Sequence, residues 1–263
     1  MTQIDDDYDR NGYAVFRGLL SNDSISDIFD QIERVFDTSL SAIGERITDH
    51  AGVDAKYLQL KTRHPEIKAY CYNVLGMLHG VRHALSNETV LAFGRKLYGT
   101  PLLAGYMQVR IDDPSDDRLL PMHQELELMS LMNLNIWIPL TDTGGNRGGL
   151  RVVPGSHRSG LHVHHRVEEP QNYWSLPLSL IDEERVVTLD LAAGDALVFH
   201  PFLFHGSVPN SSSTIRWTLV GRWSELNHVP YLRSARASMS MDRNPDPTAP
   251  GNQFVRQYLA TSK

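Results

Sequence analysis

The triplet His123-Gln124-Glu125 places an imidazole and a carboxylate two residues apart, just before a strand-like run at 134–140. Side chains at i and i+2 of an extended segment point the same way, so His123 and Glu125 are predicted to face one metal ion. A second His-X-acid triplet, at 64–66, opens a predicted helix, and we interpret it as a surface cap.

His205 is the natural third ligand, because it directly follows the apolar run 196–204. Two imidazoles and one carboxylate leave three positions of an octahedral ion open, which suits non-haem Fe(II) oxygenases. His200 competes for this role, but strand alternation directs it to the opposite face, where we expect a hydrogen bond within the fold. The same three residue types also describe a catalytic zinc site with a nucleophilic bound water.

Arg216 and Ser207 have the spacing of a carboxylate clamp. Arg216 falls 11 residues after His205 on the next predicted strand, and Ser207 falls two residues after His205. A guanidinium fork beside a hydroxyl suits a carboxylate bidentately, as a dicarboxylate co-substrate requires. A single arginine on a strand is more often a surface ion pair, but this spacing favours the clamp. A zinc-type hydrolase has no need of a binding site for a dicarboxylate, so this spacing counts against it.

The strand-like run at 134–140 has a polar face and an apolar face. Asn133, Asn135 and Trp137 alternate with Leu134, Ile136 and Ile138. If the aliphatic residues pack on helices, the other three line the interior of a barrel, where polar groups suit a binding pocket. A plain core aromatic is the alternative interpretation of Trp137.

The predicted secondary structure that positions these residues changes from mainly helices to strands near residue 101. Earlier segments at 25–36, 65–85 and 87–99 have helical spacing or caps, after a short strand at 13–16. Later β-like runs fall at 102–111, 131–140, 150–153, 185–191, 196–204 and 215–223, between turn-forming clusters. We predict one domain over 1–263, with a helical part at 1–100, a β-sandwich or jelly-roll core at 101–240 and a C-terminal arm at 241–263.

Composition narrows the function classes. Among 263 residues, one cysteine stands against 12 histidines, which excludes an internal disulfide and multi-cysteine metal sites. The net charge of −6 offers no basic field for nucleic acid. An acidic start and the lack of a long apolar run predict neither a signal peptide nor a membrane span, and hence a cytoplasmic protein. The oligomeric state is not readable.

Four further histidines gather at 157–165, after Pro154-Gly155. A second metal site there is the alternative to a solvated loop, and we favour the loop. Cys71 lies on the apolar face of a predicted helix and is interpreted as core.

The chain resembles the phytanoyl-CoA dioxygenase-like family of Fe(II)/2-oxoglutarate-dependent oxygenases over most of its length. The matching blocks are 11–20 (NGYAVFRGLL), 122–125 (MHQE), 137–140 (WIPL), 148–158 (GGLRVVPGSHR), 194–200 (GDALVFH) and 205–210 (HGSVPN), followed by Arg216. Their order and spacing are far more specific than any single block.

This resemblance implies a mainly β fold with flanking helices, a cupin-like double-stranded β-helix. It implies Fe(II) bound by His123, Glu125 and His205, with 2-oxoglutarate and O2 as co-substrates. The distal carboxylate of 2-oxoglutarate goes to Arg216 and Ser207 and its pocket to Trp137, while Gln108 and Arg110 match positions that face the active site in some relatives. The implied reaction is hydroxylation of a small molecule with release of succinate and CO2.

One residue departs from the family pattern, which usually has Asp where this chain has Glu125. The extra methylene requires a shift of the metal or of the strand. Related halogenases have Gly or Ala at this position, so halogenation is not expected.

Two alternatives stay open on the sequence, a zinc-type hydrolase and a non-catalytic jelly-roll binding protein. The predicted pocket walls at 112–121 and 157–180 contain no motif that identifies the substrate. Arg110, Arg147 and Arg222 favour an anionic substrate.

Overall fold

Two facing antiparallel sheets form the centre of the computed structural model, which describes residues 2–45, 52–99, 102–116, 120–125, 133–168 and 173–225. The larger sheet has the order β1-β8-β3-β10-β2 and the smaller one β7-β4-β9, while β5 and β6 form a separate hairpin. The strands are β1 (Tyr13–Phe16), β2 (Leu102–Asp112), β3 (Asn133–Pro139), β4 (Leu150–Val152), β5 (His165–Val167), β6 (Tyr173–Ser175), β7 (Val187–Leu189), β8 (Ala196–Phe199), β9 (His205–Ser207) and β10 (Arg216–Glu225).

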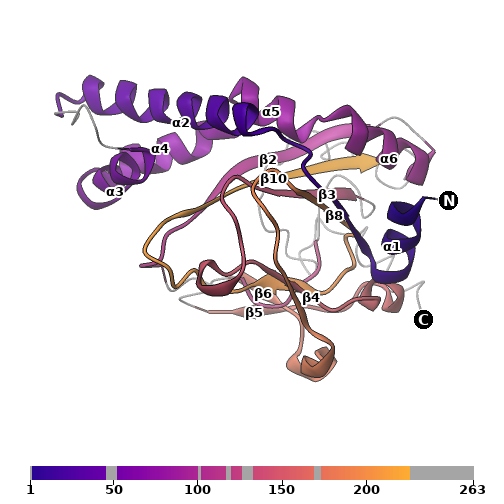
Figure 1. Ribbon diagram of the computed structural model, residues 1–263. Helices are drawn as coiled ribbons and strands as arrows, with labels where there is room; N and C mark the ends of the chain where they lie inside the picture. The colour runs from indigo at the N-terminus through magenta and orange to yellow at the C-terminus, as the bar shows by residue number, and fades with distance from the viewer. Residues whose placement is uncertain are drawn as a thin grey trace, which may run out of the picture.

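The two sheets lie one above the other (Figure 1). An isolated antiparallel bridge between His123 and His205 adds one more segment beside β9, at the edge of the smaller sheet. This arrangement is the jelly roll that the strand pattern predicted.

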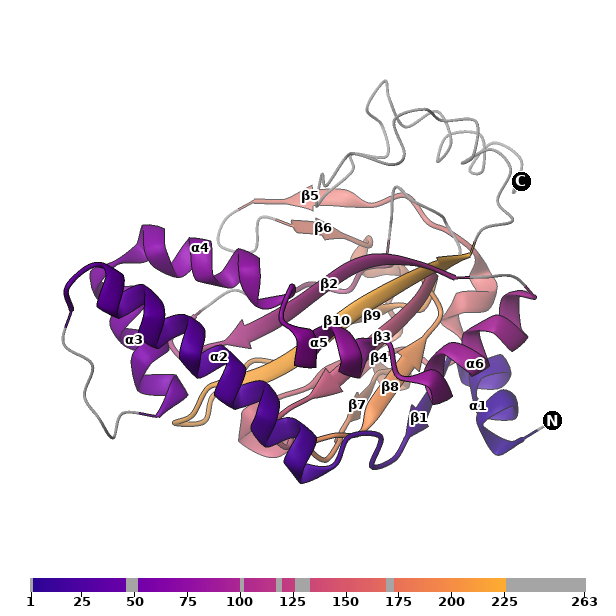
Figure 2. The same ribbon diagram turned by 90° about the horizontal axis from the view of Figure 1, so that it is seen from above.

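The helices belong to the N-terminal part and lie mainly over the outer face of the larger sheet (Figures 1 and 2). They are α1 (Gln3–Asn11), α2 (Asn22–Ala42), α3 (Val53–Arg63), α4 (Pro65–Leu75), α5 (His79–Leu85) and α6 (Glu88–Tyr98). The Ser21 hydroxyl caps α2 by accepting the N–H of Ser24, and Gly99 ends α6 in the left-handed conformation. Short 3-10 turns occur at 145–147, 156–159, 178–180 and 183–185.

The main core lies between these helices and the larger sheet. Leu134, Ile136 and Ile138 of β3 are buried there with Trp217 and Leu219 of β10, as the alternation of β3 predicted. The next residues along each strand face the smaller sheet, so the space between the sheets is where polar side chains collect.

The predicted helix over 65–85 is wrong in one respect, because it breaks after Leu75 and restarts at His79. Gly76 lies against β2, where an added Cβ would come within 2.2 Å of the carbonyl oxygen of Met107. Only glycine fits at this close approach. The helices α1 and α3 were not predicted.

The predicted strand at 196–204 is also too long. β8 ends at Phe199, the chain turns at 201–202, and His205 begins β9 in the other sheet. The predicted arm at 241–263 lies outside the described residues. Within the described part, no helix is long and apolar enough to cross a membrane.

Candidate metal centre

His123 and His205 lie side by side because their backbones pair. Each donates its N–H to the carbonyl of the other, at 2.8 and 3.1 Å. Glu125 is held two residues further on by a backbone hydrogen bond from its N–H to the carbonyl of Pro201, at 2.8 Å. The turn between β8 and β9 thus presents a backbone edge on which the 123–125 segment lies, with both imidazoles and the carboxylate on one side.

The three side chains converge on one point. Oε1 of Glu125 lies 3.8 Å from Nε2 of His123 and 3.4 Å from Nε2 of His205. The ligand atoms all lie within 4.8 Å of one another, and all three residues are buried. Atoms bound about 2.1 Å from a common ion are separated by up to about 4 Å, so one ion can bridge them after a small adjustment.

The hydrogen bonds behind the imidazoles determine their tautomers. Nδ1 of His123 lies 2.7 Å from the carbonyl oxygen of Pro121, and Nδ1 of His205 lies 2.9 Å from that of Leu203. A carbonyl can only accept, so each Nδ1 carries the proton and each Nε2 presents a lone pair. Nε2 of His123 is buried without a hydrogen-bond partner. Three electron-pair donors that face one another in a buried site fit a divalent cation.

The charges around this centre keep its ligands in the metal-binding protonation state. Burial lowers the pKa of His123, and the neighbouring His205 lowers it further, so the imidazole is neutral at pH 7. Burial alone would raise the pKa of Glu125, but the charge of Arg222 and the two imidazoles outweigh it and hold that pKa well below its ordinary value.

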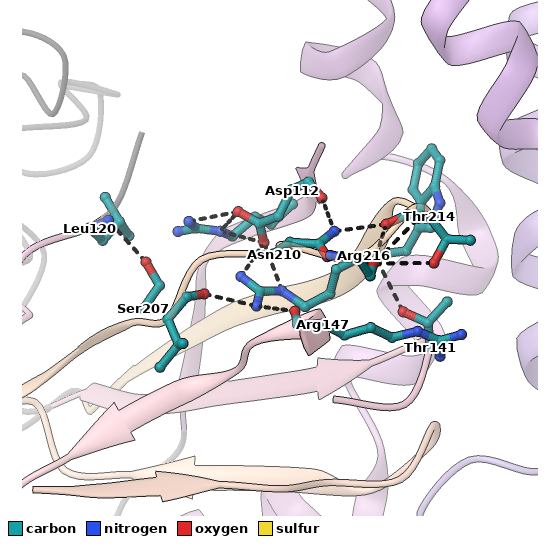
Figure 3. A network of polar contacts seen from close by, with 12 residues as sticks. Asp112, Leu120, Thr141, Arg147, Ser207, Asn210, Thr214 and Arg216 are labelled. Carbon is teal, nitrogen blue, oxygen red and sulfur yellow. Dashed lines mark hydrogen bonds and ion pairs between the residues drawn. The ribbon is translucent and has the colours of Figure 1, made fainter. Parts of the chain in front are cut away.

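Arg216 lies at the centre of a polar network, and Ser207 lies at one end of it (Figure 3). The Arg216 side chain is 2% exposed and pairs with Asp112, and its Nη1 donates to the carbonyls of Arg147 and Val208. Ser207 Oγ accepts the N–H of Leu120 at 2.9 Å. Asp112 was not singled out from the sequence, since nothing in its neighbourhood along the chain shows that it meets Arg216.

The remaining predicted pocket residues are all placed near the inner face of the larger sheet. Trp137 is buried in an apolar cluster between the sheets, with Leu197 among its neighbours. Asn135 donates to the carbonyl of Phe199 at 3.3 Å, and its Oδ1 is buried without a hydrogen-bond partner in the described part. Gln108 donates to the carbonyl of Tyr72 at 2.6 Å.

Arg110 is half-buried against Asp112, with Nε 2.8 Å from Oδ1. Burial disfavours its charge, but Asp112 outweighs this and raises the pKa of the guanidinium. Asp112 therefore joins two arginines, Arg110 and Arg216.

The four histidines at 157–165 do not form a metal site; within the described residues, His123, Glu125 and His205 are the single group of metal-binding side chains whose ligand atoms come together. His164 corrects the interpretation as a solvated loop, because it is 4% exposed and its Nε2 accepts the N–H of Gln124 at 3.0 Å. Gln124 in turn donates to the carbonyls of Gly160 and Phe202. His200, as predicted, hydrogen-bonds within the fold and accepts the N–H of Phe202.

Two residues of the centre were not assigned there from the sequence. Arg222 pairs with Glu125 across 97 positions of the chain. Tyr173 of the β5–β6 hairpin packs edge-on against His123, with ring centroids 4.9 Å apart. The sequence named Arg222 only among the arginines that favour an anionic substrate. Its even spacing from Arg216 places both side chains on the inward face of β10.

Fold and site together define a jelly-roll protein with a candidate metal centre of two histidines and one carboxylate. The sequence profile of the phytanoyl-CoA dioxygenase (PhyH) family matches residues 8–218. The chain belongs to this family and is an Fe(II)- and 2-oxoglutarate-dependent oxygenase, with Fe(II), 2-oxoglutarate and O2 as cofactor and co-substrates. This membership decides against the zinc-type hydrolase and the non-catalytic binding protein.

Several curated proteins are similar to this chain at low sequence identity. The 1-deoxypentalenic acid 11-beta-hydroxylase of Streptomyces arenae is 25% identical over 80% of this chain and 75% of its own length. The peroxisomal phytanoyl-CoA dioxygenase of Bos taurus is 24% identical over 84% of this chain and 67% of its own. The L-proline trans-4-hydroxylase of Streptomyces griseoviridis is 22% identical over 61% and 68%.

Solved structures share the fold. The epimerase SnoN, in a complex with Fe3+, alpha ketoglutarate and nogalamycin RO, superposes with a TM-score of 0.57 at 17% identity over 94% of this chain and 92% of that one. The apo non-heme monooxygenase ThoJ gives 0.59 at 19% identity, over 85% and 77%. At these identities the likeness concerns the jelly roll alone.

Proposed function

We propose that this protein hydroxylates an unactivated C–H bond of a small anionic molecule, with 2-oxoglutarate converted to succinate and CO2. The observation that carries the proposal is the convergence of two imidazole lone pairs and one carboxylate oxygen in a buried site that Arg222 of β10 contacts. When bound, iron supplies, with 2-oxoglutarate and O2, the oxidation that places one oxygen atom in the substrate and one in succinate.

His123, Glu125 and His205 hold the metal in this proposal, and Arg216 with Ser207 receives the distal carboxylate of 2-oxoglutarate. Arg216 is buried and fixed by three acceptors, which supports a preorganised guanidinium. Thr218, two residues further along the same face of β10, is fully buried and its hydroxyl has no hydrogen-bond partner in the described part. Unsatisfied polar atoms at Thr218 and Asn135 support a polar ligand between the sheets.

Trp137, Asn135 and Gln108 complete the co-substrate pocket. Their burial between the sheets excludes water, and a water-poor site strengthens each ion pair and hydrogen bond with the ligand.

Arg110 is the proposed contact for the substrate. Arg110 faces Asp112 through Nε and Nη2, and the rest of its guanidinium suits an anionic group of the substrate. Tyr173 stands among these charges, and burial, followed by the negative charge of Glu125, raises the pKa of its hydroxyl above the ordinary range. The phenol is therefore a neutral hydrogen-bond donor. The relatives act on small molecules according to their names, including deoxypentalenic acid and proline.

The proposal includes one oxygenase domain over 1–263 and a cytoplasmic location, which the single cysteine supports. No nucleic-acid partner is expected from the net charge of −6.

The test is an anaerobic titration with Fe(II) and 2-oxoglutarate, followed by exposure to oxygen. The weak visible charge-transfer band of the chelate is expected first, then succinate, and His205→Ala is expected to abolish both. Screening small carboxylic acids for a product heavier by one oxygen atom then tests hydroxylation. A wild-type protein that shows neither band nor succinate refutes the proposal.

A further inference from the structure

Glu125 uses its two carboxylate oxygens differently. Oε1 is the oxygen that faces the imidazoles of His123 and His205. Oε2 accepts a hydrogen bond from Nη2 of Arg222 in a charged pair. The side chains are 9% and 14% exposed, so little water screens the pair.

The backbone aims Arg222 at this carboxylate. On one side, β10 pairs with β3 in unbroken register, with Arg222 opposite Asn135. On the other side its register with β2 shifts between Gly221 and Trp223, which face Met107 and Ala104. Two residues of β2 therefore stand opposite Arg222. Such a bulge bends β2 and redirects its side chains, which places the Tyr106 ring beside the Arg222 guanidinium.

Tyr106, one of the two residues in the bulge, supports the guanidinium from a third direction. The central carbon of the Arg222 guanidinium lies 5.2 Å from the centroid of the Tyr106 ring. Stacking on an aromatic face suits the planar guanidinium and reduces its freedom to leave Glu125.

We infer that Arg222 is a positioning residue for the metal ligand Glu125, holding Oε2 so that only Oε1 reaches the ion. This inference rests on the proposed role of Glu125. A carboxylate free to rotate could offer both oxygens and take a fourth position on the metal. Held by Arg222, it takes one, and three remain for a chelating co-substrate and O2.

The pairing also accounts for glutamate at a position where aspartate is usual in the family. The longer side chain has one more rotatable bond, and Arg222 removes the freedom that this bond adds. An aspartate, shorter by one methylene, would not bridge from the histidines to Arg222. The inference therefore predicts that Glu125 and Arg222 act as a coupled unit.

Co(II) affinity, followed by visible absorption without 2-oxoglutarate or O2, tests this coupling in a double-mutant cycle. Arg222→Met is expected to weaken Co(II) binding about tenfold or more in the native background, the usual cost of losing a partner behind a ligand. In the Glu125→Asp background the same change is expected to alter affinity less than about twofold. Arg95→Met, an exposed arginine on α6 that pairs with Glu88, is the matched control.

The direction of the change in Co(II) affinity distinguishes a positioning role of Arg222 from a purely electrostatic one. Removing a cation beside a cation site should tighten metal binding through space. Loss of Arg222 also raises the pKa of Glu125, but binding weakened by protonation recovers as the pH rises, so weaker binding that persists at higher pH requires loss of the carboxylate's position. Arg222→Lys, which keeps the charge without the fork, is expected to weaken binding by an intermediate factor of about three. If Glu125→Asp binds Co(II) too weakly for the cycle to be completed, the order of Co(II) affinities among wild type, Arg222→Lys and Arg222→Met tests the positioning role instead.

Unchanged or tighter Co(II) binding by Arg222→Met overturns the inference, as does an equal loss in both backgrounds. If wild-type protein forms the Fe(II)/2-oxoglutarate band but Arg222 and Glu125 are uncoupled, only the positioning role fails. If wild-type protein binds no metal at all, the proposed function itself fails.

Discussion

Asp112 anchors Arg216: its Oδ2 lies 3.2 Å from Nε and 3.0 Å from Nη2 of the guanidinium. The same carboxylate accepts two hydrogen bonds from Nε of Arg110. Burial would raise the pKa of Asp112, but the charges of Arg110 and Arg216 outweigh it and lower that pKa. One anion between two cations leaves a net positive charge, available to a ligand carboxylate.

We expect the two arginines of this cluster to bind different ligands. Arg216→Lys should weaken binding of 2-oxoglutarate about tenfold, because a lysine lacks the fork that a carboxylate uses. Arg110→Lys should change it less than about twofold, since Arg110 is assigned to the substrate. Anaerobic titration of the Fe(II) chelate band measures both. The reverse order would move the co-substrate anchor to Arg110.

Metal removal is expected to destabilise the protein. A divalent ion at about 100 times its Kd adds about 2.7 kcal/mol of stability, equivalent to a few degrees in Tm for a chain of this size. A chelator should therefore lower the Tm of the wild type and leave that of Glu125→Ala unchanged. Glu125→Asp should retain part of the shift, and Glu125→Ala should lose succinate formation. Full turnover by Glu125→Ala would show that another carboxylate binds the metal.

Stability should fall in mild acid because of His164. Burial, aided by the nearby His123, lowers the pKa of His164 from 6.5 to about 4. A histidine that stays neutral in the folded state contributes fully above pH 6.5, and this contribution is lost as the pH falls toward 4 because the unfolded chain binds the proton first. The loss is roughly 3 kcal/mol.

Chemical denaturation of metal-free protein at several pH values measures this slope. His164→Gln should flatten it between pH 6.5 and 4, whereas His165→Gln, an exposed neighbour, should leave it unchanged. Equal slopes for wild type and His164→Gln would mean that His164 is protonated in the folded state.

Gly76 should not tolerate a side chain. Its added Cβ would meet backbone of β2 at 2.2 Å, which the strand cannot relieve without moving, so Gly76→Ala is expected to cost about 2 kcal/mol. Gly94 on α6 is the matched control, since an added Cβ there meets only the ends of leucine side chains. Gly94→Ala should cost less than about 1 kcal/mol, because alanine also favours the helix. Urea denaturation compares the two variants; equal losses would contradict the close approach at β2.

Local rules of the chain made much of this protein predictable from its sequence. Period-two alternation put Leu134, Ile136 and Ile138 on the helix-facing side of β3, and capping residues gave the start of α2 and the end of α6. The spacing of His123 and Glu125 indicated a shared direction for the same reason. Each of these depends on neighbours within a few residues, whose geometry the backbone dictates.

The tertiary structure alone decided which distant side chains meet. Arg222 reaches Glu125 because β10 carries it opposite Asn135 in the larger sheet, from where its side chain meets the carboxylate of a segment paired with β9. Asp112 couples two arginines because it lies directly opposite Arg216 of β10 and two residues from Arg110 on its own strand, and a shift of that pairing by one residue would send Asp112 and Arg216 to opposite faces. Likewise, position 76 requires glycine because β2 passes too close for a side chain. Strand order and register set these contacts, and neither is encoded in any short stretch of sequence.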